Sequence, residues 1–474
     1  MSSREILIGI TCGLFLFAIG VKSDVYLGDE AYHFTFAKGI YESKSRIPSN
    51  PIYAPYPKLD YFYFDVPLWH ELLAGLWWAV GFPSEIMAQI YQILYSLLLV
   101  ISSYFLGRNL YGEKVGKMGA IVLLSTPLIV AFSILLYLDV PVAAWSIFSL
   151  WMIHCRKWLF SGIGMGAMLL TKVNSFLLLP GFVILVFLQT DNLWTERIKA
   201  FILVSLPTFL INLPEVYFRK THFGFFYYIS PQYLPKDGPS GVVVFEPSSL
   251  YLQPWNLFIY FGIVIWIGLG VYFIKNLLER KDWFLWIPIG SYILLFPILF
   301  HYSLPARNLS PILAPLAILG GKGIASLINK KIKLIVLSLC LFQFIVVSGK
   351  IYVERQIPSG IKESYVYIQN HTAPRDIFLY LEENLVLYTN RPIVWSHIIE
   401  LPKLLWQAEG EEIKSILKKY EVSYIAVKKD RIFNDLSTKH TGGYPKLFVE
   451  KLPKQEFLRL VFDNSEISIW QVRP

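Results

Sequence analysis

The sequence predicts an α-helical protein that crosses a membrane many times and ends in a small α/β domain. Of its 474 residues, 55% are hydrophobic and 16% are charged, whereas soluble domains carry about 25% charged residues. Long uncharged runs separate the charges, and a bilayer core of roughly 30 Å requires about 20 apolar helical residues. Runs of this kind are 86–106, 118–138, 255–274, 283–300 and 334–349.

The positions of the positive charges predict the orientation. Lysine and arginine favour the inner ends of spans, and most of those between the runs fall in inner connections if the N-terminus is cytoplasmic. The residues after the first run do not resemble a signal-peptide cleavage site, so we expect a span there. We expect about eleven transmembrane helices in a multi-pass protein of the cell membrane, at 5–22, 86–106, 118–136, 140–154, 158–171, 174–189, 198–215, 254–274, 283–300, 308–327 and 334–350.

The net charge of +9 does not indicate a nucleic-acid partner, because the basic residues lie at the ends of apolar runs instead of on one soluble face. The three cysteines lie in or beside apolar runs and form no metal-spaced pair. The sequence also contains no HExxH, CxxC, Walker or GxGxxG element. We therefore predict no metal-ligating residues and no nucleotide cofactor, and the sequence leaves open whether the protein depends on a divalent ion.

Two parts of the chain do not read as ordinary spans. The first is an outer loop, 23–85, with amphipathic stretches at 29–41 and 67–80 that we expect to lie along the membrane surface. The second is 351–474, where strands are expected at 376–381, 423–428, 457–462 and 467–472 and helices at 358–370 and 400–420. The predicted division is a transmembrane domain, 1–350, and an extracytoplasmic α/β domain, 351–474.

Two adjacent carboxylates, Asp29 and Glu30, follow the first span. A carboxylate near a membrane surface can serve as a general base if it is held within reach of a hydroxyl. A second interpretation is that Asp29 caps the helix that begins at Glu30, where acidic residues are favoured. The two interpretations are compatible, because a capping residue is rigidly held.

A further carboxylate, Asp139, stands at the outer turn between two uncharged spans. Between Lys117 and His154 it is the only ionisable side chain other than tyrosine. A charge at membrane depth is costly and marks a candidate functional site. The alternative is a turn residue before Pro141, which suits the first turn of a helix.

Two cations, Lys172 and Arg307, lie at proposed outer ends of spans. A cation at either position could bind a lipid phosphate or stabilise a leaving phosphate. The alternatives are a snorkelling lysine and a head-group anchor. His70, in the second amphipathic stretch, is a polar interface residue or a substrate contact. The glycines between 162 and 166 indicate close helix packing.

These sites, in this order, resemble the GT-C superfamily of membrane glycosyltransferases, in particular the protein-O-mannosyltransferase, aminoarabinose transferase and RgtA/B/C/D-like families. The first-loop Asp-Glu of these families is matched by Gly28-Asp29-Glu30-Ala31-Tyr32-His33. Their Pro-Pro-Leu helix start corresponds to Asp65-Val66-Pro67-Leu68, which has one proline. The Gly-containing turn corresponds to 81–85, the later aspartate to Asp139 and the Leu-Thr-Lys element to Leu170-Thr171-Lys172. The resemblance covers about residues 24–190, with a weak extension to Arg307.

The resemblance implies a role for each of these residues. Asp29 would be the catalytic base that activates the acceptor, and Lys172 and Arg307 would bind the carrier phosphate. Glu30, Tyr32, His70 and Asp139 would contribute to substrate binding. Aminoarabinose transferases have a lysine where this chain has Asp65, which argues against a lipid A acceptor.

The implied reaction transfers a sugar from a polyprenyl-phosphate donor to a protein, lipid or glycan acceptor at the outer membrane face. It proceeds by direct displacement with inversion. The partners are then membrane lipid, the lipid-linked donor and the acceptor, and no cofactor is predicted.

Two rival functions remain open. A transporter or flippase of lipid-linked sugars usually has its polar groups near the bilayer midplane on broken helices, whereas these carboxylates lie at span ends. A non-catalytic membrane subunit would depend on its C-terminal tail, residues 351–474, and would tolerate replacement of Asp29.

Overall fold

The computed structural model describes residues 3–26, 29–44, 67–190, 193–223, 254–275, 279–300, 306–380, 382, 384–394, 404, 408–433 and 444–473. Helices occur at every position where a span is expected. They are α1 (Ser3–Lys22), α4 (Glu85–Tyr111), α5 (Glu113–Ser125), α6 (Pro127–Ile134), α7 (Asp139–His154), α8 (Trp158–Leu169), the 3-10 helix η2 (Val173–Leu178), α9 (Leu179–Gln189), α10 (Trp194–Phe223), α11 (Pro254–Lys275), α12 (Trp283–Phe300), α13 (Ser310–Ala325) and α14 (Lys330–Glu354).

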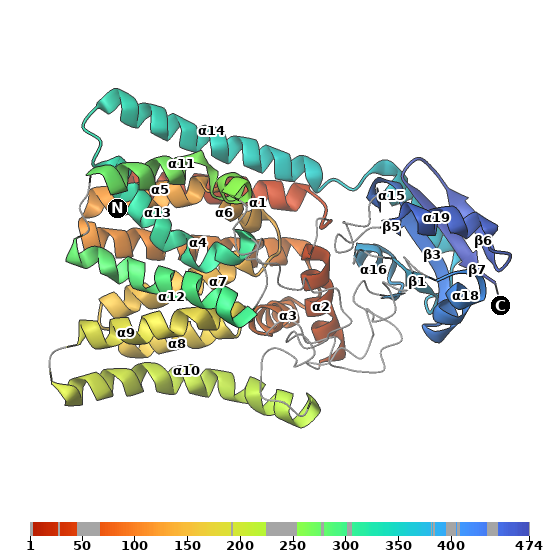
Figure 1. Cartoon of the computed structure of the whole chain (residues 1–474), viewed down its shortest axis with the longest axis horizontal. Helices are drawn as coiled ribbons and strands as arrows, with labels where there is room; N and C mark the ends of the chain where they lie inside the picture. The colour runs from red at the N-terminus through yellow and green to blue at the C-terminus, as the bar shows by residue number, and fades with distance from the viewer. Residues whose placement is uncertain are drawn as a thin grey trace.

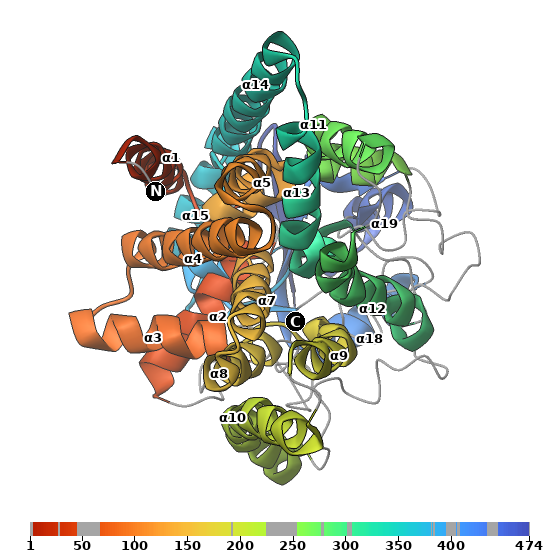
Figure 2. The ribbon, with the colours of Figure 1, turned by 90° about the vertical axis from the view of Figure 1, so that its left-hand side faces the viewer.

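These helices form one bundle, which is seen end-on in Figure 2. Among the described residues, four helices are long and apolar enough to cross a membrane, and five if the bent pair α5 and α6 forms one span. The bend of 65° falls at Thr126, because Pro127 at the start of α6 cannot continue the hydrogen bonding of α5. The chain is thus a multi-pass membrane protein, and its exact number of spans stays a prediction.

Glycines allow close helix contacts in the bundle, as the sequence predicted for 162–166. A Cβ on Gly162 would collide with the carbonyl group of Val204 in α10, and one on Gly166 would press against Ile211 at 3.1 Å. Both glycines lie in α8, which packs directly along α10. The absence of a side chain therefore sets the separation of these two helices.

Two short helices lie at the end of the bundle nearest the tail (Figure 1), where the sequence predicts surface helices: α2 (Glu30–Ser43) and α3 (Leu68–Val80). They pack against each other, and Phe34 of α2 contacts the ring of Trp77 at 5.0 Å between centroids. The indole of Trp77 also donates to the carbonyl of Ser84, which caps α4. The pair is therefore fixed to the bundle.

The tail is a small α/β domain, as expected. Its five-stranded sheet has the order β2-β1-β3-β7-β6, with β1 parallel to β2 and β3 and the remaining pairs antiparallel. The strands are β1 (Ile377–Leu379), β2 (Ile393–Val394), β3 (Val422–Lys428), β6 (Leu458–Asp463) and β7 (Ile467–Val472), and β4 (Ile432–Phe433) and β5 (Tyr444–Pro445) form a separate pair. The helices are α15 (Ser359–His371), α16 (Asn384–Thr389), α18 (Gly410–Lys419) and α19 (Lys446–Lys451).

The four predicted strands and the helix at 358–370 are confirmed. Of the predicted helix at 400–420, α18 forms the later part, and most of 400–407 lies outside the described residues. The strands β2, β4 and β5 were not predicted, because each is two residues long and such short strands carry no detectable periodicity.

One face of the tail sheet packs on the bundle through α2. Tyr32 and Phe36 of α2 share a hydrophobic cluster with Tyr365 of α15 and Phe378 of β1. The opposite face packs under α18 and α19. The tail is thus in direct contact with the helix that begins at the Asp29-Glu30 pair.

Candidate active site

Asp29 stands at the N-cap position of α2, as the capping interpretation predicted. Its side chain, however, accepts no capping hydrogen bond from the helix. The backbone amide of Asp29 instead donates to the hydroxyl of Tyr137, with 2.7 Å between the two atoms. Capping therefore does not account for the carboxylate, and the residue is held through its backbone.

The hydrogen bonds of Gln92, in α4, fix the segment that carries Tyr137. The amide nitrogen of Gln92 donates to the carbonyls of Phe132, at 2.6 Å, and Tyr137, at 2.9 Å. Its amide oxygen accepts from the indole of Trp69 at 3.2 Å. Because Gln92 is fully buried, these bonds form away from water and hold Tyr137 firmly.

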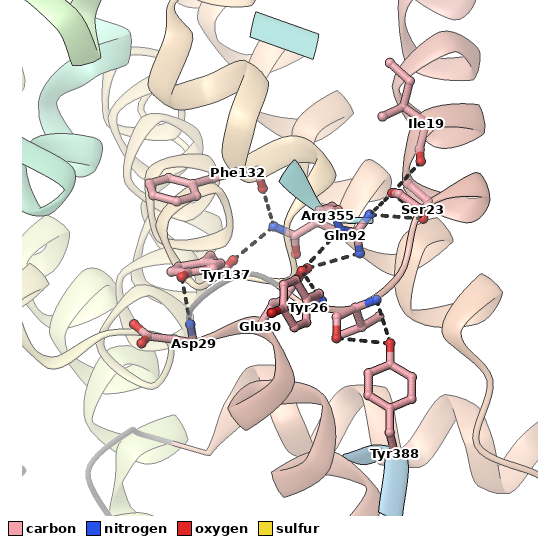
Figure 3. A network of polar contacts seen from close by, with 12 residues as sticks. Ile19, Ser23, Tyr26, Asp29, Glu30, Gln92, Phe132, Tyr137, Arg355 and Tyr388 are labelled. Atoms are coloured by element: carbon pink, nitrogen blue, oxygen red, sulfur yellow. Dashed lines mark hydrogen bonds and ion pairs between the residues drawn. The ribbon is translucent and has the colours of Figure 1, made fainter. Parts of the chain in front are cut away.

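Glu30 points to the other side of the segment from Asp29 (Figure 3) and forms a buried ion pair. Its Oε2 lies 3.1 Å from Nη2 of Arg355, and its Oε1 accepts from Nε of Arg355 at 3.2 Å. The Oε1 atom also accepts from the backbone amide of Tyr26 at 2.8 Å. Both charged side chains are 0% exposed.

Asp139 and Lys172 form a second ion pair. Nζ of Lys172 lies 2.7 Å from Oδ1 of Asp139, which also accepts from the hydroxyl of Ser310 at 3.2 Å. Asp139 is the first residue of α7, and Lys172 immediately precedes η2. A lysine ammonium has three donors, so the pair leaves Lys172 able to bind a further oxygen.

The two carboxylate sites lie at the same end of the bundle. Tyr137 precedes Asp139 by two residues and contacts Asp29 through its hydroxyl. The start of α3 reaches the Lys172 turn, because the amide of Leu68 donates to the carbonyl of Leu170 at 3.0 Å. Residues that are far apart in sequence thus converge beside α2 and α3.

His70 is buried against a second histidine. Its Nε2 lies 3.0 Å from Nδ1 of His33, and the rings of Phe36 and Trp69 lie 4.9 Å and 5.3 Å from the His70 ring. Burial, and then the nearby His33, hold the pKa of His70 well below its usual value. When both rings are neutral, the N–H of one ring can donate to the unprotonated nitrogen of the other.

Tyr32 is also buried, and its ring contacts His33, Phe36 and His70. For Arg307 the structure gives only the backbone, in the 3-10 helix η6 (Ala306–Leu309). The helix leads directly to Ser310, the partner of Asp139. The side chain of Arg307, and the whole of Asp65, lie outside the described residues.

Among the residues of this site that the sequence did not single out are Arg355, Gln92 and His33, the partner of His70. Arg355 follows the last long helix directly, where an arginine reads as a head-group anchor. Gln92 lies within an uncharged run whose other residues are mostly apolar. A polar side chain within a mostly apolar run is the sequence signal that could have identified it.

The described residues contain no group of three or more histidine, cysteine, aspartate or glutamate side chains placed to hold a metal ion. A cavity of about 800 Å³ lies at the opposite end of the bundle, near Arg280, Lys281 and Trp283. Basic and aromatic residues of this kind are typical of the head-group level of a membrane. The cavity shares no lining residue with the site around Asp29.

Residues 65–218 match the family "dolichyl-phosphate-mannose-protein mannosyltransferase". No curated protein sequence matches the chain significantly. Several solved structures share its fold. ArnT from Cupriavidus metallidurans bound to undecaprenyl phosphate is 14% identical, with a TM-score of 0.62 over 99% of this chain and 98% of ArnT.

Two other solved structures are similar. The oligosaccharyltransferase AglB from Archaeoglobus fulgidus, in complex with an inhibitory peptide and a dolichol-phosphate, is 12% identical, with a TM-score of 0.55 over 90% of this chain and 70% of AglB. The arabinofuranosyltransferase AftD from Mycobacteria is 13% identical, with a TM-score of 0.56 over 100% of this chain and 40% of AftD.

The fold and the family match agree with each other and with the order of the sequence motifs. The chain has the fold of these solved membrane glycosyltransferases, and residues 65–218 match a mannosyltransferase family model. The matched stretch, 65–218, includes His70, Tyr137, Asp139 and Lys172, whereas the Asp29-Glu30 pair and Arg355 lie outside it.

Proposed function

We propose that this chain transfers a sugar from a polyprenyl-phosphate donor to the hydroxyl of a protein, lipid or glycan acceptor. The observation that carries the proposal is the placement of Asp29. Its backbone amide is fixed by Tyr137 at 2.7 Å, while its carboxylate is not used to cap α2. A carboxylate on a rigid segment is suited to remove a proton from a bound hydroxyl.

In the proposed reaction, the acceptor oxygen attacks the anomeric carbon of the sugar as Asp29 takes its proton. The bond from that carbon to the phosphate oxygen breaks, and the polyprenyl phosphate leaves with the electron pair. The configuration at the anomeric carbon is inverted. Lys172 and Arg307 are the cations that would offer positive charge where negative charge develops on the phosphate.

The donor class is supported by two similar proteins. ArnT is described as bound to undecaprenyl phosphate and AglB as bound to a dolichol-phosphate. We place the reaction at the outer membrane face, with the N-terminus cytoplasmic and the tail extracytoplasmic. The bias of lysine and arginine in the sequence supports this orientation.

The test is sugar transfer from a panel of radiolabelled polyprenyl-phosphate sugars, in membranes that hold the parent protein or Asp29→Asn at equal abundance. We expect transfer by the parent and a loss of about 10²- to 10⁴-fold in the variant. Equal transfer by both would remove Asp29 from the mechanism. A parent that transfers no sugar from any donor would favour transport of the lipid-linked sugar instead.

A further inference from the structure

Arg355 connects the end of the last long helix to the segment that carries Asp29. Its Nη1 donates to the carbonyl of Gly20 at 3.0 Å and to the hydroxyl of Ser23 at 2.8 Å. Its Nε and Nη2 meet the two carboxylate oxygens of Glu30. Through these contacts a single side chain links the end of α1 to the start of α2 (Figure 3). The guanidinium is 0% exposed.

The tail holds the same segment at two further points. The hydroxyl of Tyr388, in α16, accepts from the amide of Val25 at 3.0 Å and donates to its carbonyl at 3.2 Å. A carboxylate oxygen of Asp24 accepts from the amide of Ile357 at 2.8 Å. The two backbone groups of Val25 are therefore satisfied by one tail side chain and not by secondary structure.

A third tail residue, Lys428 of β3, lies over the ring of Tyr26, with its ammonium 4.9 Å from the ring centroid. Burial alone would lower the pKa of Lys428, but Glu382 and Tyr26 raise it above its usual value. The lysine therefore stays charged and retains its cation–π contact with Tyr26.

Glu30 is fully buried and is held by Arg355 and by the backbone amide of Tyr26. Breaking such a pair would leave a charge buried without compensation, which is strongly unfavourable. Since Asp29 and Glu30 are adjacent, a displacement of Glu30 would move the backbone of Asp29 with it. The position of Asp29 is thus set from one side by Tyr137 and from the other by Glu30 and Arg355.

We propose that Arg355 and Tyr388 are positioning residues for Asp29, and that Glu30 is the anchor through which Arg355 acts, not a ligand of the substrate. In this proposal the tail completes the active site by holding the catalytic segment. The inference rests on the proposed function of Asp29.

The test compares Arg355→Lys with the parent, as purified full-length protein in lipid. Lysine keeps the charge but lacks the planar fork that meets both oxygens of Glu30. We expect kcat per folded molecule to fall about 10- to 100-fold, as small misplacements of reacting groups do. KM for the donor should stay within about twofold, because the guanidinium of Arg355 is 0% exposed and is engaged by Glu30. The control is Lys446→Gln, which replaces an exposed lysine of the tail and should have the kcat and KM of the parent.

Hydrogen exchange supplies a readout that does not depend on transfer. We expect faster amide exchange across 23–30 in Arg355→Lys, with exchange in α4 and α7 unchanged. Parent-like kcat, or a raised KM with kcat unchanged, would overturn the positioning role. A merely structural role would lower the amount of folded protein while kcat per folded molecule stayed the same, which would also overturn it.

Tyr388→Phe is the second variant if Arg355→Lys does not fold. It keeps the ring stacked on Tyr365 and removes only the hydroxyl that holds Val25, so we expect a smaller fall in kcat, about 3- to 10-fold. Parent-like kcat in this variant would overturn the proposal. Loss of transfer in Asp29→Asn with normal transfer in both positioning variants would leave the proposed function standing and overturn this inference alone. No transfer by the parent would overturn both.

Discussion

The ammonium of Lys172 lies 2.7 Å from Oδ1 of Asp139, although the two residues are 33 positions apart in the sequence. Their side chains are 17% and 2% exposed. A carboxylate buried to this degree requires a counter-charge, because burial of an unpaired charge is costly. The charge of Lys172 therefore serves the stability of the site as well as any role toward a phosphate.

Replacement of Lys172 by methionine should destabilise the protein. Breaking a buried ion pair typically costs roughly 3–5 kcal/mol, and the partial exposure of Lys172 places the expected loss at the lower end. Arginine at this position keeps the charge, so Lys172→Arg should retain most of the stability. Thermal unfolding of the purified variants measures both effects.

Asp139→Asn in the Lys172→Met background removes both charges. If the cost in Lys172→Met comes from the unpaired carboxylate, the double variant should be more stable than Lys172→Met. The matched control is Lys117→Met, which breaks an exposed pair with Glu113 and should cost less than about 1 kcal/mol. A Lys172→Met protein as stable as the parent would contradict the prediction.

Tyr137→Phe should slow transfer without weakening donor binding. Phenylalanine keeps the ring stacked on Phe132, with 4.7 Å between centroids, but removes the oxygen that accepts from the amide of Asp29. We expect kcat to fall about 10-fold, and stability to fall by about 1 kcal/mol since a partly buried donor loses its partner. The readouts are single-turnover transfer and thermal unfolding.

The control for Tyr137→Phe is Tyr95→Phe. It also removes one buried hydroxyl, which lies 2.9 Å from that of Tyr91 inside the bundle, and it leaves the Asp29 segment untouched. Transfer by Tyr95→Phe should match the parent. Equal losses in the two variants would show that the effect of Tyr137→Phe is general and not specific to Asp29.

The helical part of the fold could be predicted because its signals are local. Apolar stretches predicted a span at the position of every long helix of the bundle, and Ser84 before α4 supplies a cap, its hydroxyl accepting from the amide of Met87. The number of spans could not be predicted in the same way. Helices such as α6, with 8 residues, are too short to cross alone, and only packing decides whether two short helices share one span.

Short motifs in the sequence were enough to propose candidate site residues, but not to find the distant contacts that hold them. Asp139 and Lys172 were proposed because each is a charge that interrupts apolar sequence, and Asp29 because it forms a pair of adjacent carboxylates with Glu30 just after the first span. The partner of Glu30 was missed because Arg355 is 325 positions away. No periodicity or spacing in the sequence encodes such a pairing, since it depends on how the tail packs on α2.

Gly162→Ala should destabilise the bundle. A Cβ at this position would collide with the carbonyl of Val204, and overpacking a close contact typically costs about 1–3 kcal/mol. The control is Gly270→Ala in α11, where an added Cβ would meet nothing within 4 Å. Since alanine is the better helix former, Gly270→Ala should be neutral or stabilising. Thermal unfolding of both variants decides, and equal stability of the two would contradict the packing argument.

Acid should weaken the packing of α2 against α3 through His70. The pKa of His70 is held well below its usual value by burial and by His33, so the folded protein keeps this ring neutral where the unfolded chain binds a proton. The unfolded state then binds more protons, and stability rises with pH. The contribution of His70 is complete above the unfolded pKa, about 6.5, and is lost progressively as the pH falls below it.

The measurement is thermal unfolding of the parent, His70→Gln and His371→Gln between pH 8 and pH 5. Carboxylates also titrate toward the acid end of this range, so the informative quantity is the difference in slope between proteins. His70→Gln should have the flatter dependence, by at most about 1.4 kcal/mol per pH unit for one proton. His371 is exposed, and its variant should follow the parent. Parallel slopes for the parent and His70→Gln would mean that the buried His33–His70 contact does not resist protonation.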